Sequence, residues 1–306
     1  MVTQLDAKSR QFIDGLKQIQ LRSQRAQQQI TSGRRVNKPS DDPGSIPEIL
    51  GLQGNLQHVQ QTRTGLQRVQ TELQTADTAL QQATSLMDRA ATLGAQANSD
   101  ILDSDKRKTL AQEVRQVQDS LLALSQTNVN GRYIFSGDSD QIAQYQANPA
   151  SPTGVWQVQT VTATRQVAGL DKQTFSVDRT ASEIFDARQA DGAVAGSNAF
   201  AAIQRLATAL ETNDMAALPD ILQKVREAGT HINQELSHYG VSENRVTEQL
   251  DFAQKVELQF TARLSEVRDT DTTQAILDLT QSGQHLQAAI AARGQIPRST
   301  LFDILG

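Results

Sequence analysis

Two stretches, one near each end of this 306-residue chain, repeat apolar or small residues in alternating steps of four and three positions. The first stretch places Leu5, Ser9, Phe12, Leu16, Ile19, Ser23, Ala26 and Ile30 in register. The second places Ala275, Leu279, Ser282, Leu286, Ala289, Arg293 and Ile296 in register, with Arg293 interrupting the apolar stripe. An average step of about 3.5 residues keeps one seam of a helix turned toward a partner helix, which is the coiled-coil condition. We therefore expect two terminal helices that need partners, in a protein whose work is assembly.

Both stripes are too narrow to form a deep core. Polar residues such as Gln20 and Gln27 intrude beside the first one, so its helix is marginal without a partner. The chain as a whole is 38% hydrophobic and only 4% aromatic, which is low for a globular enzyme. This composition suits the surface of helices and provides few large side chains for a buried pocket.

Charge and cysteine content exclude several classes of function. The net charge is −5 and no basic block is interleaved with aromatic residues, so nucleic acid is not expected as a partner. The chain has no cysteine, hence no disulfide framework, thiolate nucleophile or zinc ribbon. No apolar run approaches the ~18 residues of a membrane span, so no membrane is expected either. The first residues lack the apolar segment of a Sec-type signal peptide, which predicts a cytoplasmic protein or export without a cleaved signal.

Periodicity and turn residues predict long helices in the N-terminal part. The first helix is expected at about 3–32 and ends at Gly33. A turn-rich segment follows, in which Asp42 is expected to cap the next helix with Pro43 at its first position. That second helix is expected from about 47 to 98. A third, carrying an apolar face from Leu110 to Leu124, is expected to end before residue 131.

The middle of the chain changes to strand-like patterns before helices return. Strands are expected at 132–137, 155–161 and 174–177, in a small exposed module over about 133–195. Its core is expected to consist of Phe135, Trp156, Phe175 and Phe185. Helices resume near residue 197, with a pause at Tyr239-Gly240, and the last helix follows residues 268–271.

These patterns predict a mainly α protein. We expect an elongated antiparallel coiled coil or helical bundle built from both chain ends, with a small β-containing domain inserted. The expected parts are an N-terminal helix and turn for assembly and export (1–46), a long helical segment (47–132) and a β-containing outer domain (133–196). Returning helices (197–268) and a C-terminal helix for assembly and chaperone binding (269–306) complete the chain.

No catalytic, cofactor-binding or metal-binding residues emerge from the sequence. The four histidines are scattered, and the seven-residue spacing of His231 and His238 does not suit a shared metal. The carboxylate pairs Asp41-Asp42 and Asp269-Asp271 lie at helix starts, where capping explains them better than acid–base chemistry. The sequence also has no nucleophile elbow and no phosphate-binding loop. We therefore expect no enzyme activity and no cofactor.

One segment resembles a known family. The run Gln29-Ile30-Thr31-Ser32-Gly33-Arg34-Arg35-Val36-Asn37-Lys38-Pro39-Ser40-Asp41-Asp42-Pro43 is similar to the turn that closes the first helix in the flagellin superfamily. Within it, Lys38-Pro39-Ser40 resembles the branch that joins hook to filament more than filament flagellin, as does Tyr133-Ile134-Phe135-Ser136-Gly137. Residues 266–271, 286–289 and 299–305 resemble the C-terminal pattern of the superfamily. The likeness covers the helical halves, about two thirds of the chain, and no match is found for the β module.

This resemblance implies a structural component of the bacterial flagellum, exported by the flagellar type III apparatus to the cell exterior. The implied partners are further copies in a ring-like homo-oligomer, the first hook-associated protein, flagellin and an export chaperone. Assembly is expected to depend on Leu16, Ile19, Ile30, Leu279, Leu286 and Leu301. The turn signature is expected to depend on Ser32, Gly33, Asn37, Pro39, Asp41 and Asp42.

Two alternatives remain at this stage. Filament flagellin belongs to the same superfamily, and monomers that form long filaments alone would favour it. A soluble coiled-coil adaptor is the alternative from another class. It would fold fully in the cytoplasm, with ends before about residue 40 and after about 265 that resist proteases. An enzyme is the weakest interpretation because no convergent polar site is found.

Overall fold

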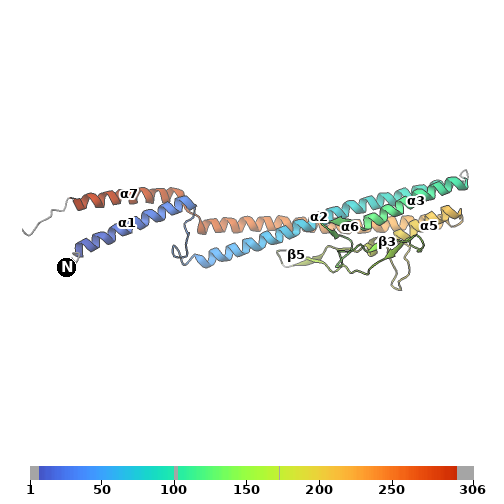
Figure 1. Ribbon diagram of the computed structural model, residues 1–306, viewed down its shortest axis with the longest axis horizontal. Helices are drawn as coiled ribbons and strands as arrows, with labels where there is room; N and C mark the ends of the chain where they lie inside the picture. The colour runs from blue at the N-terminus through green and yellow to red at the C-terminus, as the bar shows by residue number, and fades with distance from the viewer. Residues whose placement is uncertain (1–6, 100–102, 172, 295–306) are drawn as a thin grey trace, which may run out of the picture. The chain divides into compact units, whose positions relative to one another are not determined.

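The computed structural model describes residues 7–99, 103–171 and 173–294, and these are mainly helical. The helices are α1 (Ala7–Ser32), α2 (Ile46–Ala97), α3 (Ser104–Ser125), α4 (Ala181–Ile184), α5 (Ala199–Thr212), α6 (Leu218–Arg268) and α7 (Thr272–Gly294). The strands are β1 (Asn128–Val129), β2 (Arg132–Tyr133), β3 (Tyr145–Ala147), β4 (Val155–Gln157), β5 (Gln166–Ala168) and β6 (Thr174–Ser176). Helical chain ends with a small inserted β-containing segment confirm the predicted fold class (Figure 1).

The chain forms two compact units, and each holds part of α2 and of α6. The terminal unit comprises residues 1–58 and 256–306, and the central unit comprises residues 59–255. In the terminal unit α1 and α7 pack side by side (Figure 1). Its small core is made by Val36, Ile49, Leu264 and Val267, with Ile46, Leu52 and Leu56 packed against them.

In the central unit α2 and α6 run antiparallel. The backbone of Gly94 lies against the side chain of Leu222, and further along Gln74 Nε2 donates to Glu243 Oε1 at 3.2 Å. The apolar heptads of the sequence supply this core, from Leu66 and Leu80 on α2 to Val246 on α6. The core therefore forms along the seam that the periodicity predicted.

Local signals fix the ends of the shorter helices. Asp103 caps α3 by accepting from the backbone of Lys106 at 2.9 Å. Asn198 caps α5 in the same way, and this helix ends at Asn213, whose φ of 58° is the left-handed conformation that asparagine tolerates. α3 and α5 pack against each other, and Arg115 links them by an ion pair to Glu211 at 3.0 Å.

The β-containing segment consists of three separate antiparallel pairs among the described residues: β1–β2, β3–β4 and β5–β6. Its aromatic side chains pack together with those of the helices. Phe135 and Phe185 meet edge to face with ring centroids 6.0 Å apart, and Phe185 also stacks on Phe200 of α5 at 5.8 Å. Two-stranded sheets are marginal alone, and here they share one apolar core with the helices.

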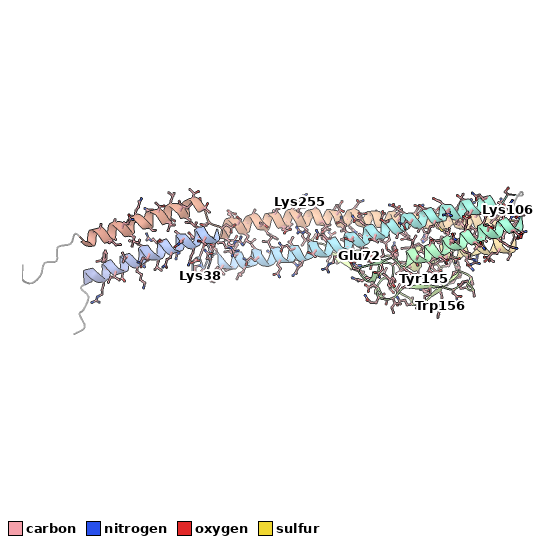
Figure 2. All side chains as sticks on the ribbon, turned by 45° about the horizontal axis from the view of Figure 1, so that its top comes forward. Lys38, Glu72, Lys106, Tyr145, Trp156 and Lys255 are labelled. Carbon is pink, nitrogen blue, oxygen red and sulfur yellow. The ribbon has the colours of Figure 1, made fainter. Side chains whose placement is uncertain are left out.

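Some local expectations are wrong. Trp156 was expected in the core but is 63% exposed (Figure 2), and buried Tyr145 occupies the interior instead. Because Trp156 stands opposite Gln146 on the β3–β4 pair, its side chain belongs to the solvent face. The expected strands at 132–137 and 155–161 are also shorter, ending at Tyr133 and Gln157.

Two expectations about helix ends are wrong as well. α2 begins at Ile46, so Asp42 and Pro43 lie in a preceding turn and do not start the helix. α6 shows no pause at Tyr239-Gly240 but continues through both residues. Tyr239 is buried there and its ring contacts Phe135 with centroids 6.2 Å apart, so tertiary packing outweighs the glycine.

Candidate assembly site

The heptad stripes of α1 and α7 are the faces on which these two helices pack. In α1 the partly or fully buried positions are Phe12, Leu16, Ile19, Ser23, Ala26, Gln29 and Ile30, and the other residues from Arg10 onward are exposed. In α7 they are Ala275, Leu279, Ser282, Gly283, Leu286 and Ala289. We call these two faces together the seam. Five of the six expected assembly residues lie on it, and Leu301 lies outside the described residues.

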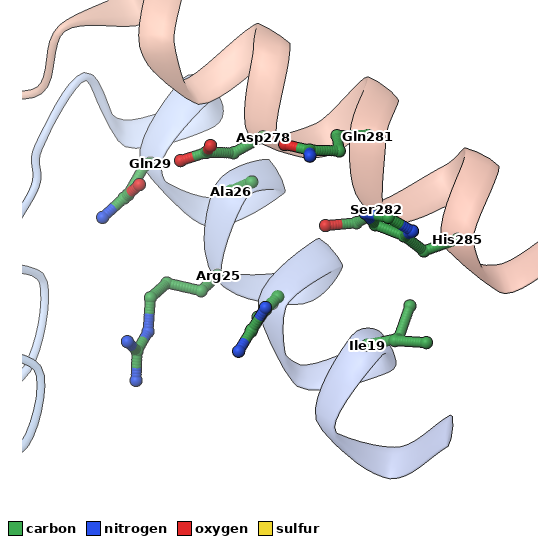
Figure 3. Close-up of a pocket in the computed structure, with 9 residues that line it drawn as sticks. Ile19, Arg25, Ala26, Gln29, Asp278, Gln281, Ser282 and His285 are labelled. Carbon is green, nitrogen blue, oxygen red and sulfur yellow. The ribbon is translucent and has the colours of Figure 1, made fainter. Parts of the chain in front are cut away.

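The seam is only partly closed. Ala26, Ala275 and Ser282 are buried, whereas the larger seam residues remain half-buried. A cavity of about 350 Å³ lies between the two helices. It is lined by Ile19, Arg22, Arg25, Ala26 and Gln29 from α1 and by Asp278, Gln281, Ser282 and His285 from α7 (Figure 3). Two helices alone therefore leave apolar surface of the seam in contact with water.

Further apolar side chains lie outside the seam, and the sequence analysis did not identify them. Ile13 and Leu21 on α1, and Ile276, Leu277 and Ile290 on α7, are each about half exposed. We call these five residues the outer set. Ile276 and Ile290 are two heptads apart and directly follow the seam positions Ala275 and Ala289. Apolar residues that follow seam positions by one residue are visible in the sequence, and they could have predicted a second contact face.

A hydrogen-bonded clasp holds the end of α1 against the turn between α6 and α7. The backbone N–H of Arg35 donates to Arg268 O at 2.8 Å, and Thr270 N–H donates to Gly33 O at 3.0 Å. The guanidinium of Arg35 adds a bond from Nη2 to Val267 O at 2.7 Å. We call residues 33–36 and 267–270 the clasp. It lies beside the apolar core of the terminal unit, to which Val36 and Val267 belong.

The turn-signature residues shape the chain around the clasp. Gly33 has φ +67°, a left-handed conformation that ends α1, and its N–H donates to Gln29 O at 2.8 Å. Ser32 Oγ accepts from Arg34 N at 3.1 Å, and Asn37 Nδ2 donates to Arg34 O at 2.9 Å. These bonds replace the helical ladder that stops at this point.

The two aspartates of the signature act within the same turn. Asp41 accepts backbone N–H bonds from Asn37 at 3.0 Å and from Lys38 at 2.8 Å, which folds the chain around Pro39. Asp42 accepts from the hydroxyl of Ser45 and forms an ion pair with Arg35 at 2.8 Å. Among the signature residues, Pro39 contributes through its position in the turn.

Electrostatics favour the ionised carboxylates beside the clasp. Hydrogen bonding from Ser45, followed by that from Arg35, lowers the pKa of Asp42 to about 2. In the clasp segment 267–270, a hydrogen bond from Arg268 Nε at 2.8 Å lowers the pKa of Asp269. Both carboxylates are therefore charged at neutral pH, and each adjoins an arginine of the clasp.

Histidines and carboxylates outside the clasp do not gather into a metal cluster in the described part of the chain. No group of three or more potential metal ligands occurs among the residues that the structure describes. His231 contacts the backbone oxygen of Glu183 at 2.7 Å, while His238 lies beside the ring of Tyr239, so the two histidines have different surroundings. No helix in the described part of the chain is long and apolar enough to cross a membrane.

Comparisons with known proteins agree with this arrangement. Residues 7–140 match the bacterial flagellin N-terminal helical region, and residues 222–304 match the bacterial flagellin C-terminal helical region. The chain is 25% identical to flagellar hook-associated protein 3 of Escherichia coli, over 90% of this chain and 91% of that protein.

Solved structures show the same fold. A putative flagellar hook-associated protein from Vibrio parahaemolyticus superposes with a TM-score of 0.65 at 18% identity, covering 75% of this chain and all of that one. The flagellar junction protein of Legionella pneumophila gives a TM-score of 0.55 at 15% identity, covering 66% of this chain and 99% of that one.

The two flagellin regions together take in more than two thirds of the chain and contain α1, α7 and both segments of the clasp. The superfamily expected from the turn signature is therefore confirmed. The chain belongs to the flagellin superfamily of bacterial flagellar proteins, and within it the chain is similar to flagellar hook-associated protein 3 of Escherichia coli.

Proposed function

We propose that this chain is a structural subunit that joins the hook-associated zone of the flagellum to the filament by packing of its terminal helices, without catalysis. The observation that carries the proposal is the half-closed seam between α1 and α7. In a self-sufficient two-stranded coiled coil, the two helices would bury the apolar side chains of the seam between them. Here Leu16, Ile19 and Leu286 remain half-buried, so further helices can add to the pair.

The seam and the outer set have different parts in this proposal. Seam residues Leu16, Ile19, Ile30, Leu279 and Leu286 hold α1 and α7 together within one subunit. The outer set then meets helices of neighbouring subunits, because its five large apolar side chains each leave about half of their surface exposed in the described chain. Leu301, which lies outside the described residues, is also proposed to contribute to assembly.

Membership of the family supports a proposal for the partners of this chain. We propose copies of this chain in a ring-like homo-oligomer, with the first hook-associated protein on one side and flagellin on the other. An export chaperone is proposed to hold the C-terminal helix before type III export to the outside of the cell. A narrow pair of terminal helices with a small core suits such export, because few apolar contacts must be undone.

The parts of the chain divide this work. We assign assembly and export to residues 1–46, assembly and chaperone binding to residues 269–306, and the supporting rod to residues 47–132 and 197–268. Residues 133–196 adjust the outer fit to neighbouring subunits. The signature residues Ser32, Gly33, Asn37, Pro39, Asp41 and Asp42 set the angle at which the chain leaves α1, together with Arg35 of the clasp.

Three substitutions on α7 test the proposal. Ile276→Asp removes an apolar side chain of the outer set, Leu286→Asp places a charge in the seam, and Gln287→Asp is the matched control at an exposed polar position. Each purified variant is added to isolated hook ends that carry the first hook-associated protein, and addition is followed by electron microscopy and by subsequent filament growth from flagellin.

We expect the Gln287→Asp variant to assemble like the unmodified chain. Ile276→Asp is expected to keep the α1–α7 pair, measured by circular dichroism, yet to lose assembly. Leu286→Asp is expected to lose both. Normal assembly by both Ile276→Asp and Leu286→Asp would refute a role for the terminal helices. Growth of long filaments from the chain alone would instead identify it as a filament flagellin.

A further inference from the structure

Five charged side chains in the central unit connect α2 with the β-containing segment. Glu72 comes from α2, Arg132 from β2, Asp140 from the loop beyond it, Arg165 from the residue before β5 and Asp178 from the stretch after β6. Arg165 Nη1 lies 2.5 Å from Glu72 Oε2 and 3.9 Å from Asp178 Oδ1, while Arg132 is paired with Asp140. Arg165 thus pairs the residue before β5 with α2 and also with Asp178 after β6 (Glu72 is labelled in Figure 2).

The cluster carries an unbalanced charge. Three carboxylates face two guanidinium groups, so one negative charge remains when all five groups are ionised. Asp178 is the most buried carboxylate, with 9% of its side chain exposed against 17% for both Glu72 and Asp140. Its distance to a guanidinium is also the longest of the three. A single proton on Asp178 would balance the cluster at the position where a charge is least well solvated.

From α6, the uncharged side chain of Tyr239 lies near Asp178. Tyr239 is buried, and its burial together with the negative charge of Asp178 raises the pKa of its hydroxyl. Burial also raises the pKa of Asp178 to about 6, since the attraction of Arg165 only partly offsets desolvation. Glu72 and Asp140 act in the same direction as burial, and Arg132 opposes them. The burial of Asp178 and the charge balance of the cluster therefore both indicate Asp178 as the group that takes up a proton.

We propose that Asp178 makes the docking of the β5–β6 hairpin on α2 pH-sensitive, so that proton uptake in mildly acidic surroundings tightens this contact and proton loss loosens it. Besides the charged cluster, the hairpin is held by Phe175 and Val177, which belong to the central core. Phe175 packs beneath the guanidinium of Arg245 at 5.2 Å, and Gln249 Nε2 donates to Asp171 at 3.3 Å. A short hairpin that docks on longer elements can open locally while the long helices stay folded, so the charged cluster can bias this opening without unfolding the chain.

The direction follows from linkage. The docked hairpin binds the proton of Asp178 more tightly than an open hairpin whose aspartate has the ordinary pKa of 3.8. The stabilisation is thus complete at pH values below the ordinary pKa and is lost as the pH rises through about 6. A pKa raised to about 6 makes the opening equilibrium roughly tenfold more favourable at pH 8 than at pH 5.

Hydrogen exchange of the backbone amides of β5 and β6 in the full chain measures this opening. Rates are recorded from pH 5 to pH 8 and corrected for the intrinsic pH dependence of exchange. Asp178→Asn mimics the protonated side chain, and Asp220→Asn changes an exposed aspartate of α6 as the matched control. We expect a roughly tenfold change in corrected opening for the unmodified chain and for Asp220→Asn. The Asp178→Asn variant is expected to show protection that stays constant with pH.

Glu72→Gln provides a second test that does not alter Asp178. Removal of the neighbouring negative charge frees Arg165 for Asp178, so the proton is bound less tightly and the response is expected to fall below tenfold. An undiminished tenfold response in Glu72→Gln would overturn the proposal. So would a pH response in Asp178→Asn as large as that of the unmodified chain, or opening that decreases as the pH rises.

Discussion

Arg35 Nη2 donates a hydrogen bond to the backbone oxygen of Val267 at 2.7 Å, although the two residues are 232 positions apart in the chain. The same guanidinium forms an ion pair with Asp42 at 2.8 Å. One side chain therefore connects the turn after α1 with the end of α6. Both segments lie beside the core formed by Val36 and Val267, so the bond fixes the exit of the first helix relative to the last turn of α6.

Replacement of Arg35 by alanine is expected to loosen the clasp. Val267 O loses its charged donor and Asp42 loses its ion pair, at a cost of about 1 kcal/mol because the arginine is partly exposed. Exchange of the Arg35 and Thr270 backbone amides, both bonded across the clasp, is expected to speed up severalfold. Lys38→Ala, in the same exposed turn, is the control and is expected to leave these rates unchanged. Equal protection in both variants would contradict a role for the guanidinium.

Acid is expected to weaken the clasp through Asp42. Its pKa in the folded chain is lowered to about 2 from 3.8, so its stabilising contribution is present above the ordinary value and is lost as the pH falls toward 2. A carboxyl ¹³C titration is expected to place the Asp42 midpoint near pH 2. In Ser45→Ala the midpoint is expected to rise, because the largest cause of the shift is removed. A midpoint unaffected by Ser45→Ala would show that the hydroxyl is not the cause.

The seam was predictable because a heptad register is a local property of the sequence. The half-buried and buried positions of α1 and α7 follow the predicted steps from Phe12 to Ile30 and from Ala275 to Ala289. The clasp signature was predictable as a turn, since glycine and aspartate act through their nearest neighbours. The bond from Arg35 to Val267 was not, because no local pattern pairs residues so distant in the chain.

The β-containing segment shows where the sequence was least informative. A three-residue strand such as Val155–Gln157 is too short for alternation to decide which face is buried. That choice depends on the pairing of Trp156 with Gln146 and on the helices that cover Tyr145. The start of α2 near residue 47 was predicted correctly, but the capping role expected of Asp42 was wrong, since Asp42 binds Arg35 and Ser45 of the turn.

The exposure of Trp156 predicts a difference between two aromatic truncations. Trp156→Ala removes a largely solvated side chain and is expected to change the unfolding free energy of the chain by at most about 0.5 kcal/mol. Phe185→Ala empties a fully buried position between Phe135 and Phe200 and is expected to cost about 3–5 kcal/mol. Urea denaturation followed by circular dichroism measures both. A large loss for Trp156→Ala would show that the indole has an intramolecular partner.

Limited trypsin digestion of the purified chain is expected to separate the terminal helices from the central unit. Arg25 is exposed on α1, whose seam is half open, so local unfolding gives the protease access at small cost. Arg115 is held by Glu211 and Gln204 inside the packed central unit and is expected to be cut much more slowly. Fragment masses read at intervals test this order.

Incorporation into assembled hook ends is then expected to protect Arg25, because neighbouring helices cover the outer set and close the seam. If trypsin cleaved after Arg25 as slowly as after Arg115 in the monomer, the terminal helices would form a stable coiled coil without further partners. That result is expected of a cytoplasmic adaptor.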